Sequence, residues 1–253
     1  MLAQQTMEKL RSLRLNGFAQ LYEEQLQRGD VAHLSFDDRL GLMVEREWVA
    51  RDEKRTNRRL KEAHLKQPAC TEDINYRSHR GLDRGVMQDL STCRWIRAKR
   101  NLLVTGSTGT GKTWLACAFA NKACREGLSS YYARVPRLIH ELSIARIDGS
   151  YLKLLAKLAR MDLLVLDDLG LCPLEHEAQQ SLLEVIDDRS GNRSTLVTSQ
   201  LPVDKWYETF ADPTIADALL DRLLGNAQQL KLKGKSLRDG REDKTQEPPE
   251  TKA

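Results

Sequence analysis

The amino-acid sequence predicts an α/β protein in which helices flank a parallel sheet and a small all-α domain comes first. Three observations lead to this prediction. From residue 101 onward, short apolar runs alternate with helical patterns. A glycine-rich motif at 106–113 joins the first of these runs to a helix, and residues up to about 68 show helical spacing only. Strands that alternate with helices are typical of a parallel sheet covered by helices.

The elements of the sheet region follow from its apolar runs and from the helical spacing between them. The expected strands lie near residues 101–105, 129–134, 162–167, 195–199 and 227–232. The expected helices lie near residues 85–91, 111–126, 136–146, 175–189 and 214–224.

The first part of the chain predicts a helical appendage. A helix with Leu10 and Leu13 on one face is expected to break at Asn16-Gly17. A longer helix should open at Ser35, with Asp38 three residues on as its capping partner. The apolar residues of this longer, third helix recur every three to four positions and are Phe36, Leu40, Met43, Val44 and Trp48.

The second half of that helix is basic. Residues 51–66 contain seven lysines and arginines against three acidic residues, so this half is not core. A local excess of positive charge indicates a surface for a polyanion, and we expect contacts with the DNA backbone. The expected DNA-binding residues are Arg51, Lys54, Arg55, Arg58, Arg59 and Lys61. The alternative is a solvated helix face balanced by Asp52, Glu53 and Glu62.

Composition excludes several classes of protein. The chain has 253 residues, of which 40% are hydrophobic, which suffices for a folded core. No apolar run approaches the roughly 18 residues of a membrane span, and residues 1–10 lack the apolar core of a signal peptide. Five cysteines without a Cys-x-x-Cys pair indicate neither a disulfide framework nor a zinc site. We therefore expect a cytoplasmic protein with no membrane partner.

The motif at 106–113 is a phosphate-binding loop, or P-loop, between a strand and a helix. Its glycines let the backbone curl so that successive N–H groups point at phosphate oxygens. Lys112 is expected to reach the β and γ phosphates, and Thr113 to offer its hydroxyl to Mg²⁺. The eight residues of the loop are Gly106, Ser107, Thr108, Gly109, Thr110, Gly111, Lys112 and Thr113. The loop predicts a P-loop NTPase.

Polar residues at the ends of later elements complete this site. Asp167 and Asp168 follow the apolar run 163–166 and fit a Mg²⁺-holding acid and a base or water-positioning group. Gln200 would lie beside the P-loop strand if the sheet places strand 195–199 between the two motifs. Arg222 lies on an apolar helical turn, where it forms a surface pair or reaches the nucleotide of a neighbouring subunit.

Together these motifs resemble the AAA+ branch of the P-loop ATPases. Within it, the chain looks like the IstB-like transposition helper ATPases, which are related to DnaC-type helicase loaders. The resemblance covers residues from about 5 to 240. Besides the P-loop, it rests on Leu15-Asn16-Gly17-Phe18, Ser35-Phe36-Asp37-Asp38-Arg39-Leu40, Asp167-Asp168-Leu169-Gly170, Thr198-Ser199-Gln200-Leu201-Pro202, Leu220-Asp221-Arg222-Leu223-Leu224 and Gly234-Lys235-Ser236-Leu237-Arg238.

The resemblance implies an ATP- and Mg²⁺-dependent ATPase that forms a homo-oligomer through its ATPase domain and works on double-stranded DNA with a transposase. By this resemblance, Lys112 and Thr113 would bind the phosphates and Mg²⁺, Asp167 would bind the metal and Asp168 would position the water. Gln200 would occupy the sensor position, and Arg222 would be the arginine finger. The chain departs from the family's pattern at Trp114, Gln200, Lys235 and Leu237, where the family often has His, Asn, Glu and an aromatic residue.

Other functions compete with this one. A helicase loader shares the same site, but its N-terminal segment should bind a partner protein through an apolar stripe. The basic residues of 51–66 instead favour nucleic acid. A small-molecule kinase would need an arginine-rich lid, which the sequence lacks. A GTPase is disfavoured because Asn121-Lys122 is followed by Ala123-Cys124 and lies in a helix, so no guanine-reading motif is present.

Four segments are expected along the chain. Residues 1–68 form a helical domain for DNA binding and assembly, and residues 69–100 a linker and leading helix. Residues 101–235 form the AAA+ ATPase domain, and residues 236–253 a polar tail that is expected to be disordered. Within the tail, Arg238 is a candidate second sensor of the nucleotide.

Overall fold

The computed structural model of the chain describes residues 2–27, 33–76, 81–234 and 236. The chain forms two compact units that divide between Arg59 and Leu60. The predicted tail from residue 237 onward, with Leu237 and Arg238, lies outside the described residues, as does Lys235. No helix in the described ranges is both long and apolar enough to cross a bilayer.

The first unit is helical, with α1 (Leu2–Ser12), α2 (Asn16–Gln27) and most of α3 (Phe36–Glu62). The predicted opening of the third helix is confirmed, because the Asp38 N–H donates to Ser35 Oγ at 3.1 Å. The predicted apolar face is only partly correct. Met43 is buried, whereas Phe36, Val44 and Trp48 are exposed.

The predicted break between the first two helices is confirmed, but it lies at residues 13–15 rather than at Asn16-Gly17. The chain turns at Arg14, which has a φ of +58°, and Gly17 lies in the first turn of α2. A Cβ on Gly17 would lie 2.9 Å from the Arg46 carbonyl oxygen, so glycine here permits close packing of α2 on α3 rather than a break.

A buried carboxylate joins these two helices. Glu47 of α3 accepts hydrogen bonds from the N–H groups of Gly17 and Phe18, at 2.8 and 3.2 Å, and from Arg51 at 2.6 Å. Burial of the carboxylate opposes its ionisation, but the hydrogen bonds from Arg51, Phe18 and Gly17 outweigh it and lower the pKa of Glu47. Glu47 therefore caps the first turn of α2, where a negative charge is favoured.

The second unit contains a five-stranded parallel sheet in the order β2-β3-β4-β1-β5. Its strands, in chain order, are β1 (Asn101–Thr105), β2 (Ser130–Arg134), β3 (Leu163–Leu169), β4 (Ser194–Ser199) and β5 (Ala227–Lys231). Each predicted strand is confirmed to within two residues at either end. The prediction of an α/β fold with a parallel sheet flanked by helices is therefore correct.

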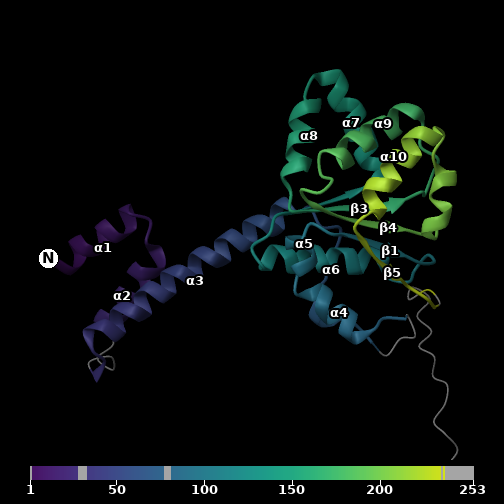
Figure 1. Cartoon of the computed structure of the whole chain (residues 1–253). Coiled ribbons are helices and arrows are strands. Elements are labelled where there is room, and N and C mark those ends of the chain that lie inside the picture. The colour runs from purple at the N-terminus through teal and green to yellow at the C-terminus, as the bar shows by residue number, and fades with distance from the viewer. Residues whose placement is uncertain (1, 28–32, 77–80, 235, 237–253) are drawn as a thin grey trace, which may run out of the picture. The chain divides into compact units, whose positions relative to one another are not determined.

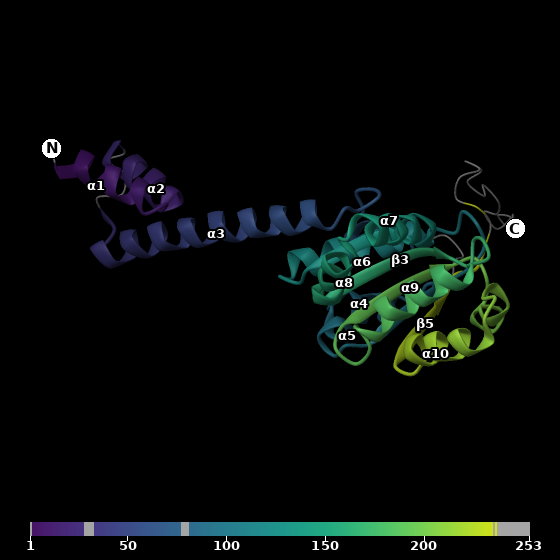
Figure 2. The same cartoon turned by 90° about the horizontal axis from the view of Figure 1, so that it is seen from above.

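Helices cover both faces of the sheet (Figure 1). One face carries α4 (Arg84–Ser91), α5 (Arg94–Arg97) and α6 (Lys112–Arg125). The other carries α7 (Val135–Asp148), α8 (Tyr151–Arg160), α9 (His176–Asp187) and α10 (Pro213–Leu224). Helices α9 and α10 lie side by side in both views (Figures 1 and 2). Buried residues of β1 alternate between the faces, since Leu102 joins the first core and Leu103 the second.

Two parts of this unit differ from the sequence-based expectation. Residues 147–161 carry no predicted element, yet they contain α8, which starts after Gly149 (φ +77°) and buries Leu155 and Leu158. The segment expected to be a polar linker is packed. It buries Ala69 and Ile74, and Glu72 pairs with Arg125 of α6 at 2.7 Å. Core contacts thus begin before residue 101.

Candidate nucleotide-binding site

The P-loop lies between the end of β1 and the start of α6, as predicted. Gly106, Gly109 and Gly111 have φ values of +151°, +81° and +91°, which side chains disfavour. A Cβ on Gly106 would lie 2.6 Å from the Leu232 carbonyl oxygen, so no larger residue fits there. Because α6 begins at Lys112, its free N–H groups and positive dipole end face the loop, which suits an anionic ligand.

Lys112 is buried inside the loop. Its ammonium donates to the carbonyl oxygens of Gly106 and Ser107 at 2.7 and 2.8 Å. The side chain is therefore folded along the loop that would surround the phosphates.

The carboxylate of Asp167 lies at the end of β3 and is fully buried. Three hydroxyls donate to it. Thr113 lies 2.9 and 3.0 Å from its two oxygens, Tyr132 at 2.6 Å, and Thr198 at 2.6 Å. Burial and the hydrogen bond to this carboxylate raise the pKa of Tyr132 well above its usual value, so the phenol stays a donor.

Asp167 and Thr113, the predicted metal ligands, thus come together from β3 and α6. A carboxylate and a hydroxyl are oxygen ligands of the kind that Mg²⁺ prefers, and Mg²⁺ is commonly held by few protein groups together with nucleotide phosphates. The donor set therefore fits Mg²⁺ beside the P-loop.

Asp168 occupies a distorted point of β3. Its φ is +64°, and the pairing of β3 with β4 shifts register between Leu166 and Leu169. The Asp168 N–H donates to Thr198 Oγ1 at 3.1 Å, and its carboxylate meets Arg134 Nε at 2.9 Å. Strained conformations of this kind cluster at functional sites, and this one turns Asp168 into the pocket while Asp167 stays buried.

Gln200 lies beside the P-loop because β4 separates β3 from β1, as the prediction requires. Thr105 of β1 pairs in register with Ser199 of β4. The Thr108 hydroxyl then donates to Gln200 Oε1 at 2.7 Å. Gln200 is thereby brought to the phosphate-binding loop.

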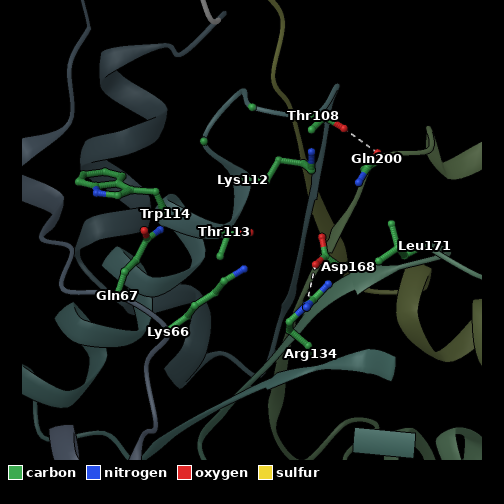
Figure 3. A pocket seen from close by; sticks show the side chains of 12 residues that line it. Lys66, Gln67, Thr108, Lys112, Thr113, Trp114, Arg134, Asp168, Leu171 and Gln200 are labelled. Carbon is green, nitrogen blue, oxygen red and sulfur yellow. Dashed lines mark hydrogen bonds and ion pairs between the residues drawn. The ribbon is translucent and has the colours of Figure 1, made fainter. Parts of the chain in front are cut away.

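These groups surround a cavity of about 430 Å³, a size that suits a small ligand (Figure 3). Its lining residues are Lys66, Gln67, Thr108, Gly109, Gly111, Lys112, Thr113, Trp114, Arg134, Asp168, Leu171 and Gln200. Sequence reasoning missed Lys66, Gln67, Arg134 and Leu171. No local motif marks Lys66 and Gln67, because their position depends on Ala63 accepting a 2.9 Å hydrogen bond from Tyr132 N–H of β2.

Arg222 is not brought to this cavity within the chain. It lies on α10, where its guanidinium donates to the Asp187 carboxylate of α9 and to the Ala218 carbonyl oxygen. The structure thus contains the surface pair that was one of the two expectations for this arginine.

The basic residues expected to contact DNA lie on the continuous helix α3. Arg51, Lys54, Arg55, Arg58 and Lys61 are exposed, and their three- and four-residue spacing places them on one face. Arg59 lies off that face and is half-buried. Arg51 is also paired with Glu47, so part of its charge is already balanced.

Comparisons with known proteins show what the chain is similar to. The family model of the IstB-like ATP binding protein matches residues 8–245. An insertion sequence ATP-binding protein of Sinorhizobium fredii is 48% identical over 238 residues, which cover 94% of this chain and 97% of that protein. The ATP-binding protein of insertion sequence IS1162 from Pseudomonas fluorescens is 51% identical over 203 residues, 80% of this chain and 88% of that protein.

Solved structures share the fold. DnaI has a TM-score of 0.57 at 21% identity, over 67% of this chain and 96% of that one. The DnaC helicase loader has a TM-score of 0.53 at 20% identity, over 69% of this chain and 99% of that one. These likenesses support a P-loop NTPase fold of the AAA+ type. The family model extends over nearly the whole sequence, including the P-loop and both aspartates, so the chain belongs to the IstB-like ATP-binding proteins of insertion sequences.

Proposed function

We propose that the chain hydrolyses ATP with Mg²⁺ at this site and uses the cycle to assemble on duplex DNA and assist a transposase. The observation that carries the proposal is the meeting of Thr113 with Asp167 beside the P-loop, with Asp168 facing the same cavity. Hydrolysis needs phosphates held by the loop, a metal that neutralises their charge and a water in line with the γ phosphate.

Each residue is assigned one task in this proposal. The loop N–H groups and Lys112 bind the phosphates. Thr113 and Asp167 would hold Mg²⁺, which would withdraw charge from the phosphate oxygens. Asp168 orients the attacking water and accepts its proton, and Gln200 contacts the γ phosphate or that water. Arg222 from a neighbouring subunit would stabilise charge on the transferring phosphate.

DNA binding is assigned to the basic face of α3. Exposed lysines and arginines on one face contact phosphates without reading sequence, because they neutralise charge and release counterions. The proposed DNA contacts on this face are Arg51, Lys54, Arg55, Arg58 and Lys61, with the half-buried Arg59 beside it.

Transposition is favoured over helicase loading by the relatives. Insertion sequence proteins match with 48–51% identity over most of their length, whereas DnaI and the DnaC helicase loader share only the fold, at 21% and 20% identity. A protein encoded by an insertion sequence is expected to act on the DNA ends of that element with its transposase.

A reconstituted DNA-joining assay tests this function. The transposase of the same element is incubated with its DNA ends and a target duplex, with and without this protein and ATP. We expect joining to depend on both the protein and ATP, and the Lys112→Ala protein not to replace the wild type. Joining that proceeds equally well without the protein would refute the role in transposition.

A further inference from the structure

A lysine outside every recognised motif lies at the proposed metal site. Lys66 Nζ is 3.9 Å from Oδ2 of Asp167, the same oxygen that accepts the Tyr132 hydrogen bond. Figure 3 shows the Lys66 side chain extended into the cavity, with its ammonium directed toward the space between Thr113 and Asp168. A cationic group thus approaches the carboxylate assigned to Mg²⁺.

The backbone around Lys66 is held on both sides. Before it, the Ala63 carbonyl accepts from Tyr132 N–H at 2.9 Å, and the His64 ring meets the Tyr131 ring edge-on at 5.5 Å. After it, Ala69 is buried in the core and Glu72 pairs with Arg125 of α6. Lys66 is therefore anchored between β2 and α6, and its position is not that of a passing surface side chain.

The electrostatics of Asp167 explain why a cation belongs there. The carboxylate is fully buried, and the three hydroxyls that donate to it carry no charge. A buried charge is costly unless an opposite charge compensates it. Lys66 can compensate it because its side chain remains 43% exposed and its ammonium reaches the carboxylate from the solvent side.

We propose that Lys66 is a positioning residue that acts as an exchangeable counter-cation for Asp167, which Mg²⁺ replaces when the metal–nucleotide complex binds. The proposal rests on the proposed function of the site. Two cations that approach one carboxylate oxygen repel each other. Without Mg²⁺, Lys66 compensates the charge of Asp167 and thereby supports phosphate binding. Once Mg²⁺ is bound, Lys66 contributes little. Lys66 thereby lowers the dependence of nucleotide binding on Mg²⁺.

Calorimetric titration with the non-hydrolysable analogue AMPPCP tests this inference without any turnover. Affinity is measured in EDTA and in Mg²⁺ for the wild type, Lys66→Met, Lys66→Gln and Lys66→Arg. The informative quantity for each protein is its AMPPCP affinity in Mg²⁺ divided by its AMPPCP affinity in EDTA. Lys205→Met, a change of an exposed lysine in another part of this unit, controls for the loss of one positive charge.

We expect Lys66→Met and Lys66→Gln to raise the ratio about fivefold, equivalent to about 1 kcal/mol, by weakening binding in EDTA alone. Lys66→Arg and Lys205→Met should keep the wild-type ratio. Equal weakening in EDTA and Mg²⁺ would make Lys66 an ordinary phosphate ligand, and unchanged affinities would make it a bystander; either result overturns the proposal. A wild-type protein with the same AMPPCP affinity in EDTA and in Mg²⁺ would instead overturn the proposed function of the site, and this inference with it.

Discussion

The hydroxyl of Thr113 lies within 3.0 Å of both carboxylate oxygens of Asp167, although 54 positions separate the two residues. This contact joins the P-loop helix to the end of β3. It therefore fixes where a metal ion would meet the phosphates.

Lys112→Ala should remove ATP binding. Its ammonium lies inside the loop on the Gly106 and Ser107 carbonyls, and no shorter side chain can carry a positive charge to the same place. Titration with ATP and Mg²⁺ measures the effect, and Lys205→Ala is the matched control. ATP affinity equal to that of the wild type would show that the loop does not use this lysine.

Asp168→Asn should bind ATP normally and hydrolyse it at least about 10²-fold more slowly, the range expected when a general base is lost. The amide keeps the shape of the carboxylate but cannot accept a proton, and it weakens the ion pair with Arg134. Phosphate release under saturating ATP checks the prediction, with Asp204→Asn as a control on an exposed acid of the same unit. Near-normal turnover would move the catalytic role away from Asp168.

Arg222→Ala should assemble and bind ATP but lose hydrolysis by about 10³-fold if the arginine acts on a neighbouring subunit. A mixture of Arg222→Ala and Lys112→Ala proteins should then recover activity, since one interface combines an intact loop with an intact arginine. The pair with Asp187 supplies the counter-experiment. If Arg222 only ties α10 to α9, Asp187→Asn should cause the same loss, and the mixture should stay inactive.

Replacing Lys54, Arg55 and Arg58 with alanine should weaken binding to every duplex about equally. The slope of log affinity against log salt should fall by about 0.9 for each DNA phosphate that the protein no longer neutralises. These residues share an exposed face of α3, and the set leaves out Arg51, whose loss would also disturb Glu47. Alanine at Arg94 and Arg97, which pair with Asp89 and Glu126, is the control. An unchanged slope would establish a solvated helix face.

The sequence alone predicts the sheet and most of the site because these depend on local signals. Apolar runs mark the strands, and glycines, Lys112 and the two aspartates mark the loop and the end of β3. What sequence reasoning missed depends on tertiary contacts. Gly17 looks like a helix breaker until α3 packs against it, and the unusual φ of Asp168 depends on pairing with β4. Lys66 reaches Asp167 only because the chain after α3 folds along β2.

The most direct test of the central claim measures assembly on DNA as a function of nucleotide. Purified protein is mixed with a linear duplex, with ATP and Mg²⁺ or without nucleotide, and the mass of the complexes is determined by sedimentation and by imaging of the particles. The account predicts oligomers on duplex DNA that form with ATP and that the Lys112→Ala protein does not form. Equal assembly with and without ATP would contradict this account. Monomers that do not bind duplex DNA but bind a replicative helicase would contradict it as well.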